Sequence, residues 1–159
     1  MRVPVTLVPQ RIVFGGDDDG GRKPGQVVGA GRRDARVGAF VIDALRAWCD
    51  GAADRQDTIG WVGGCEIGSL ASELAETDPL ARTDLAVSFE RWEAPIRSGL
   101  ARMQARGELS ECADVTVLAT ALLAAVQGGM LLSQVRRSST AYRHAVSAVI
   151  DHIESYVLR

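Results

Sequence analysis

The residues best suited to hold a nucleotide are the glycines of residues 27–34, VVGAGRRD, which partly match a dinucleotide-binding loop. In such a loop the glycines let backbone amides approach a pyrophosphate group. The third glycine of the pattern is missing, because Asp34 occupies its position, and no alternation of strands and helices follows. A glycine-rich loop without a nucleotide is therefore the favoured interpretation, and no cofactor is predicted.

Four other side chains could serve catalysis or metal binding, but none has the partners that this chemistry needs. His144 and His152 are eight residues apart in one predicted helix, whereas metal ligands on one helix are usually three or four residues apart. Ser69 lies outside the G-x-S-x-G pattern of a hydrolase. Cys65 starts a predicted helix, where a buried apolar role is favoured over a reactive thiol. We predict no catalytic residue, no metal ion and no enzymatic activity.

Helical periodicity begins at Val37 and must supply the framework for any binding site. We predict a helix over residues 36–50, with Gly51 as its stop, and a short helix over residues 66–76. The apolar face of the first helix comprises Val37, Val41, Leu45 and Trp48. The connection between the two helices is expected to pack three side chains against the core: Ile59, Trp61 and Val62.

The clearest helix start in the sequence is Asp78 followed by Pro79. Asp78 can cap the first turn, and proline suits the first helical position because its missing N–H would have no partner there. A long amphipathic helix is predicted from this point to Gly107, with a bend at Pro95.

The stretch from Asp114 to Arg137 has no charged side chain between Asp114 and Arg136, which predicts a buried helix capped by Asp114. A last helix is predicted over residues 140–158, and the short Ser-Ser-Thr link makes the two helices antiparallel neighbours. By length the uncharged run could also cross a membrane. Its interior glutamine and threonines, and the apolar stripes of the neighbouring helices, favour a bundle without a membrane.

Length and composition place the chain among soluble single domains. Its 159 residues are enough for one core, and its 18 basic and 20 acidic residues create no overall field for a nucleic acid. The three cysteines lack metal-ligand spacing and indicate reduced thiols, and no signal peptide is recognised. We predict an all-α, cytoplasmic domain over residues 37–159, preceded by an irregular glycine-rich segment over residues 1–36.

A pocket for a small apolar effector is expected among three of the helices, because such sites combine apolar walls with one or two polar groups. Its expected lining is Trp48, Phe89, Trp92, Met103, Gln127 and Met130. The alternative, that these side chains are ordinary core, is about equally favoured.

Several segments occur in an order typical of one family: residues 64–74 (GCEIGSLASEL), 89–93 (FERWE), 103–109 (MQARGEL) and 119–137. Over about residues 37–159 the chain resembles the C-terminal domain of TetR-type transcriptional regulators. The resemblance implies a helical bundle that binds an effector and forms a homodimer through a four-helix bundle of its last two long helices. The implied contacts between subunits are Leu118, Leu122, Ala125, Gly129, Leu132, Tyr142, Val146, Val149 and Ile153.

Regulators of this type normally begin with a helix-turn-helix domain whose recognition helix enters the major groove. Residues 1–36 lack that pattern, so we assign DNA binding to no residue and do not expect it of this chain. The favoured function is that of an effector-binding and dimerisation domain of a transcriptional regulator. Two alternatives are a partner that pairs with a full-length relative in inactive heterodimers and a small membrane-associated helical protein.

Overall fold

The computed structural model describes residues 36–158, and these residues form five helices and no strand. The prediction of an all-α fold is therefore confirmed. The expected irregular segment over residues 1–36 and the glycine-rich loop within it lie outside the described residues, apart from Arg36, at which the first helix begins. The helices are α1 (Arg36–Thr58), α2 (Glu66–Leu74), α3 (Pro79–Ala105), α4 (Val115–Arg136) and α5 (Thr140–Glu154).

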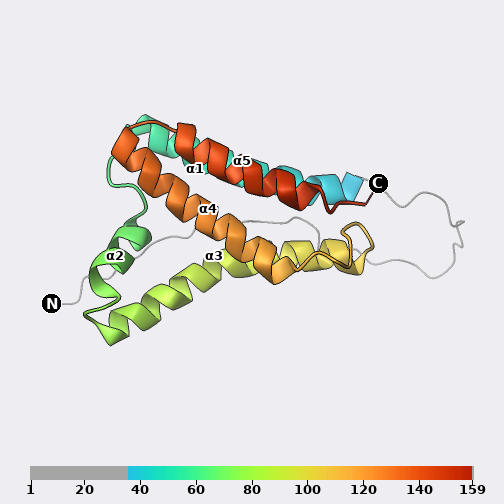
Figure 1. The fold of residues 1–159 in the computed structure, drawn as a ribbon, viewed down its shortest axis with the longest axis horizontal. Helices are drawn as coiled ribbons and strands as arrows, with labels where there is room; N and C mark the ends of the chain where they lie inside the picture. Colours follow the sequence, from blue (N-terminus) through green and yellow to red (C-terminus); the bar gives the residue numbers. More distant parts are fainter. Residues whose placement is uncertain (1–35, 159) are drawn as a thin grey trace, which may run out of the picture.

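The apolar helix α4 occupies the middle of the bundle (Figure 1). It packs against α5 on one side and α3 on the other, while α1 runs beside α5 and also contacts α3. The short helix α2 joins α1 to α3 at one end of the molecule and packs on α3. By length and composition α4 could cross a membrane, but a core helix of a soluble bundle meets the same criteria.

The two strongest start signals of the sequence form the expected caps. The Asp78 carboxylate accepts hydrogen bonds from the amides of Leu80 and Ala81 at 2.9 and 3.0 Å. The Asp114 carboxylate accepts bonds from the second and third amides of α4 at 3.0 and 3.1 Å. Both caps satisfy amides that have no partner within the helix, so local sequence was enough to place the starts of α3 and α4. Helix α3 continues through Pro95 without interruption.

The prediction that Gly51 ends the first helix was wrong, because α1 continues two turns further to Thr58. The added turns bring Ala52 and Ala53 into the core, where they are 6% and 0% exposed. This burial outweighs the cost of about 1 kcal/mol for a glycine inside a helix. The chain turns instead at Gly60, whose φ of +60° favours glycine.

The connection after α1 was only partly predicted. Trp61 is buried in the core with 1% exposure, as expected, whereas Ile59 and Val62 are 54% and 59% exposed.

Helix α5 ends at Glu154, four residues earlier than predicted. The Leu158 amide donates to the Glu108 carbonyl at 2.9 Å, and the Ser110 amide donates to the Tyr156 carbonyl at 2.9 Å. An isolated antiparallel bridge thus holds the end of the chain against the α3–α4 connection. Helix α2 likewise ends at Leu74, two residues before its predicted end.

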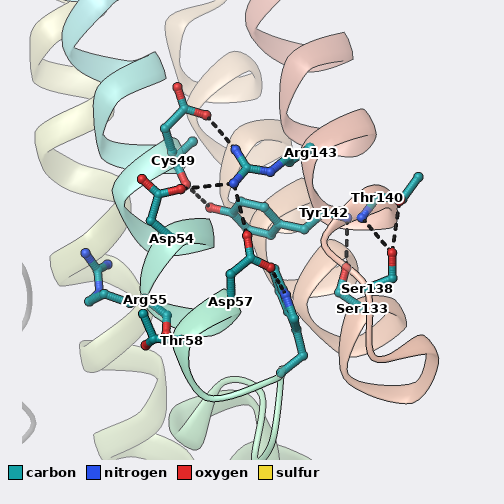
Figure 2. A network of polar contacts seen from close by, with 12 residues as sticks. Cys49, Asp54, Arg55, Asp57, Thr58, Ser133, Ser138, Thr140, Tyr142 and Arg143 are labelled. Atoms are coloured by element: carbon teal, nitrogen blue, oxygen red, sulfur yellow. Dashed lines mark hydrogen bonds and ion pairs between the residues drawn. The ribbon is translucent and has the colours of Figure 1, made fainter.

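Tyr142 forms the centre of the contact among α1, α4 and α5 (Figure 2). Its hydroxyl donates to the Cys49 carbonyl at 3.2 Å, and its ring lies 5.6 Å from that of Trp61. Its amide donates to Ser133 Oγ at 3.0 Å. This last bond caps α5 from a neighbouring helix, since the cap residue Ser139 makes no side-chain bond of its own. Ser133 is fully buried, and the hydrogen bond that its hydroxyl accepts from the Tyr142 amide explains why a polar side chain is tolerated at this position of α4.

Arg143 joins α5 to α1 by ion pairs at the surface, next to Tyr142 (Figure 2). Its guanidinium pairs with three carboxylates of α1, at 3.3 Å for Asp50, 3.0 Å for Asp54 and 3.2 Å for Asp57. Asp57 also accepts a hydrogen bond from the Trp61 indole at 2.6 Å, which, together with Arg143, lowers the pKa of this carboxyl. The start of α5 is thereby tied to the end of α1 over two turns.

Candidate functional site

Two neighbouring grooves meet at Cys65, the residue that precedes α2. The larger has a volume of about 430 Å³ and lies between α2 and α4. Volumes of this size are typical of sites for small molecules. It is lined by Cys65, Gly68, Ser69, Ser72 and Glu73 from the α2 side and by Gln127, Gly128, Leu131 and Gln134 from α4.

The smaller groove has a volume of about 220 Å³ and lies where the α1–α2 connection faces α3 and α4. Its apolar side chains include Ile67, Trp92 and Met130, and the exposed Ile59 and Val62 stand at its edge. The side chain of Gln56 donates to the Gly64 carbonyl at 3.1 Å, and its Oε1 is buried without a hydrogen-bond partner.

Two glycines allow the glutamines of α4 to cover the start of α2. A Cβ atom on Gly68 would lie 2.8 Å from Gln127 Oε1, and one on Gly64 would collide with the Gln134 side chain. Gly64 also has a φ of +59°, which L side chains rarely adopt. Glycine is therefore favoured at position 64 by its backbone conformation, whereas at both positions the nearest atoms belong to glutamine side chains whose ends can move aside.

Gln127 has unused hydrogen-bonding capacity. Its Nε2 is buried and has no partner among the described residues. An unsatisfied buried donor costs about 1–3 kcal/mol, and the terminal amide of glutamine rotates easily. An acceptor bound in the groove would therefore stabilise this side chain.

The six predicted pocket residues do not come together in one pocket. Trp92 and Met130 line the smaller groove, and Gln127 lines the larger one. Met103 is fully buried in the core, and Trp48 is half-buried and packs against that core. Phe89 is half-buried on α3.

Sequence reasoning missed the wall that α2 contributes. Cys65 was interpreted as a buried apolar residue and Ser69 was rejected as a nucleophile, and neither these two nor Ser72 and Glu73 were predicted to line a groove. The available signal was the spacing of Gly64 and Gly68 around Cys65, which indicates close approach of another element to the start of the helix.

The groove lining is suited to binding by hydrogen bonds and apolar contact. It offers two carboxamides, two serine hydroxyls and one thiol, and Glu73 is its only ionisable carboxylate. The Cys65 sulfur accepts a hydrogen bond from the Gly68 amide at 3.4 Å and so caps α2. Within residues 36–158 no group of three potential metal ligands comes together.

The residues expected between subunits mostly face the interior of the chain. Six of the nine are buried: Leu118, Leu122, Gly129, Tyr142, Val146 and Ile153. Ala125 and Val149 are half-buried against the core, and Leu132 is 48% exposed. The exposed apolar side chains of α4 lie on another face, with Val117, Leu131 and Val135 exposed by 60%, 61% and 77%.

Comparison with known proteins gives three consistent matches. A family model of the tetracyclin repressor-like C-terminal domain matches residues 41–149. The HTH-type transcriptional repressor DhaR of Mycobacterium sp. (strain GP1) is 31% identical over 75 residues, which cover 47% of this chain and 38% of that repressor. The crystal structure of a TetR transcriptional regulator from Chloroflexus aurantiacus J-10-FL superposes with a TM-score of 0.60 at 25% identity, covering 80% of this chain and 62% of the other.

The chain thus spans less than two thirds of the length of either relative. The family model matches more than half of the chain, within the part that forms the bundle and its two grooves. The chain therefore belongs to the TetR family of transcriptional regulators, as a tetracyclin repressor-like C-terminal domain.

Proposed function

We propose that this chain is the effector-binding and dimerisation part of a transcriptional regulator, and that it forms a homodimer through the exposed face of α4. Regulators of this family act as dimers, bind effectors, are generally not enzymes and are typically soluble cytoplasmic proteins. The observation that carries the proposal is an apolar stripe on α4 that is exposed apart from the half-buried Ala121, and that no other element within residues 36–158 covers.

This outer stripe has the spacing of a helix-packing seam. Its residues follow one another at intervals of four, three, four, three and four positions: Val117, Ala121, Ala124, Gly128, Leu131 and Val135. Such spacing keeps side chains on one helical face, and the alanines and the glycine let a second helix approach closely. An uncovered stripe of this length is unusual on a monomer and indicates an interface.

Helix α5 adds a second row, of three alanines and one histidine, beside this stripe. Ala141, Ala145, Ala148 and His152 are spaced by four, three and four positions and are half-buried or exposed. They lie on the side of α5 away from Arg143, whose side chain faces α1. We place the subunit contact on these two rows. Leu132, the exposed member of the nine residues expected between subunits, lies next to them.

The dimer is tested by sedimentation velocity at micromolar concentration. We expect the wild-type chain to sediment as a dimer and Ala124→Arg, at the centre of the outer stripe, to sediment as a folded monomer. Ala101→Arg is the matched control, because Ala101 is also an exposed helical alanine but lies on α3. A wild-type monomer, or a dimer that survives Ala124→Arg, would overturn the proposed interface.

We place the effector in the groove between α2 and α4. The unpartnered Gln127 Nε2 favours a ligand with a hydrogen-bond acceptor, and Leu131 and Gly128 favour a ligand with an apolar part. Glu73 is the only charged lining residue, so an uncharged ligand fits better than an anion. A ligand that binds one arrangement of the helices more tightly than another would increase the population of that arrangement. This change in population would alter the geometry of an attached DNA-binding part.

Ligand binding is tested by thermal unfolding with a panel of small esters, ketones and amides and a matched panel of carboxylates. A ligand at about 100 times its dissociation constant stabilises the folded state by about 2.7 kcal/mol. We expect such a shift with uncharged compounds, and we expect Gln127→Glu, which has nearly the same shape but no amide donor, to remove it. Stabilisation by carboxylates alone, or an unchanged shift in Gln127→Glu, would contradict this placement.

A further inference from the structure

Cys65 lies where the two grooves meet, and its thiol is the strongest nucleophile among the side chains that line them. It packs partly against the core, but its side chain is only half-buried. Its sulfur accepts a hydrogen bond from the Gly68 amide at the start of α2. An amide donor at this position stabilises the negative charge that a sulfur carries while it attacks. A compound bound in either groove therefore has a nucleophile beside it.

Gln127 holds an unused hydrogen-bond donor next to this sulfur. A Cβ atom placed on Gly68 would lie 2.8 Å from Gln127 Oε1 and 3.7 Å from Cys65 Sγ, so the carboxamide and the thiol approach the same point. The buried Gln127 Nε2 has no partner among the described residues, and half a turn of the amide puts it where Oε1 now stands. One small molecule can therefore contact the sulfur with one atom and this donor with another.

We propose that Cys65 is a modification site for uncharged α,β-unsaturated carbonyl compounds, which Gln127 orients by a hydrogen bond to the carbonyl oxygen. This assignment rests on the proposed effector site between α2 and α4, and it goes further by naming a class of compound that binds there covalently. The Glu73 carboxylate lines the same groove and repels an anionic electrophile, which favours an uncharged one.

The reaction is a conjugate addition that needs no further reactant. The thiol gives its proton to water, and the sulfur forms a bond to the β carbon of the compound. The electron pair of the carbon–carbon double bond moves to the carbonyl oxygen, where the Gln127 amide stabilises the enolate. A proton from water then adds to the α carbon. The product is an uncharged thioether, and nothing is oxidised or released.

The other two cysteines of the sequence provide an internal comparison. Cys49 is 1% exposed in the core, where burial raises the pKa of its thiol to about 12, so it should not react at neutral pH. Cys112 is exposed in the α3–α4 connection and lines neither groove. Exposure alone would make Cys112 react faster than Cys65, whereas binding and orientation of the electrophile in the groove would reverse this order.

The experiment measures the rates at which cyclohexenone adds to Cys65 and to Cys112 in the full chain, by peptide mass spectrometry at neutral pH. Iodoethane is the matched reagent, because it alkylates thiols but has no hydrogen-bond acceptor. We expect cyclohexenone to modify Cys65 about tenfold faster than Cys112, and iodoethane to modify Cys112 faster than Cys65.

Gln127→Met keeps the length of the side chain but removes the donor. We expect this variant to slow the addition of cyclohexenone to Cys65 about tenfold. The rate at Cys112 and both iodoethane rates should stay unchanged, which separates loss of the donor from a change in access to the groove. Gln127→Glu replaces this variant if circular dichroism shows that Gln127→Met is not folded.

Addition of cyclohexenone to Cys65 no faster than to Cys112, or at an unchanged rate in the folded Gln127 variant, would overturn the modification site. Reversible thermal stabilisation of Cys65→Ser by uncharged ketones would then show that the effector site stands without a covalent ligand. If no uncharged compound stabilises the chain and Cys65 is not selectively modified, the effector site and the modification site both fail.

Discussion

Gly128 and Gly129 are neighbours in the sequence, yet they lie on two faces of α4 with different surroundings. A Cβ atom on Gly129 would lie 2.8 Å from the Tyr142 Cα of α5, within the chain. A Cβ atom on Gly128 would meet no atom of the described residues within 4 Å. Gly129 is buried in the contact with α5, and Gly128 is exposed beside Leu131 on the outer stripe.

The apolar residues of α4 therefore have two different roles, one on each face of the helix. The inner face, with Leu122, Val126 and Gly129, packs against the helices of its own chain. The outer face has a similar composition but no cover within residues 36–158. The inner face contributes to the stability of the bundle, and the outer face is the basis of the proposed dimer.

The largest expected effect comes from adding a methyl group to the inner glycine. Gly129→Ala places a Cβ atom against the backbone of Tyr142, so α4 and α5 must separate, at a cost of about 3 kcal/mol. The measurement is urea denaturation in the Ala124→Arg background, in which we expect no contribution from dimer formation.

Gly128→Ala is the matched control in the same background. It meets no neighbour and removes a glycine from a helix interior, so we expect a gain of up to about 1 kcal/mol. Equal effects of the two substitutions would mean that the two faces of α4 do not differ as described.

The next largest effect is expected at Ser133, which caps α5 from the inner face of α4. Ser133→Ala leaves the buried Tyr142 amide without its acceptor and should cost about 2 kcal/mol. Denaturation by urea, monitored by circular dichroism, measures the loss. Ser69→Ala is a suitable control, because Ser69 is an exposed helical serine on α2. A loss at Ser133 no greater than at Ser69 would show that the amide finds another partner.

The contact between Cys49 of α1 and Tyr142 of α5 should also make the free energy of unfolding depend on pH in the alkaline range. Burial raises the pKa of the Cys49 thiol to about 12, and burial likewise raises the pKa of the Tyr142 hydroxyl. In the unfolded chain a thiol titrates at about 8.5, so the unfolded state loses its proton first and stability falls as pH rises. Between about pH 9 and pH 12 the thiol alone should lower the free energy of unfolding by up to about 1.4 kcal/mol per pH unit.

The check is the slope of this free energy against pH at fixed protein concentration. Cys49→Ala should be less stable at neutral pH, because it loses buried contacts, but its slope above pH 9 should be smaller than that of the wild type. An identical slope would show that the Cys49 thiol does not stay protonated in the folded state.

The smallest effect is expected for the ion pairs at the surface of the contact between α1 and α5. Arg143 pairs with Asp50, Asp54 and Asp57, but its side chain is 38% exposed and the carboxylates are more so. Arg143→Gln should cost less than about 1 kcal/mol at low salt, and 1 M NaCl should remove most of the difference from wild type. A larger loss that persists in high salt would place this network among the main supports of the α1–α5 contact.

The sequence predicted best those features that depend on a few adjacent residues. Asp78 with Pro79 and Asp114 located the starts of α3 and α4, because a cap bonds to amides two or three positions away. The end of α1 was missed because Gly51 is a local stop signal, whereas Ala52 and Ala53 continue the helix through contacts with distant parts of the chain. The end of α5 was missed for the same reason, since residues near Leu158 pair with residues near Glu108.

The candidate site was predicted in part. Gln127, Trp92 and Met130 line the two grooves. Met103 lies on α3, as Trp92 does, but it is fully buried in the core, and periodicity alone does not distinguish a core position from a groove position. The contribution of α2 depends on how closely α4 approaches Gly64 and Gly68, which only the packed structure reveals.

The amino-acid sequence by itself determined that this protein is a bundle of helices, where α3 and α4 begin, and which family it belongs to. Only the tertiary structure decided which face of α4 is interior. A helix that is apolar all round has no periodicity that marks one side, so the choice is made by the helices that pack against it. Tyr142 packs on Gly129 and leaves Gly128 exposed. With α4 in this orientation, the stripe from Val117 to Val135 faces away from the core.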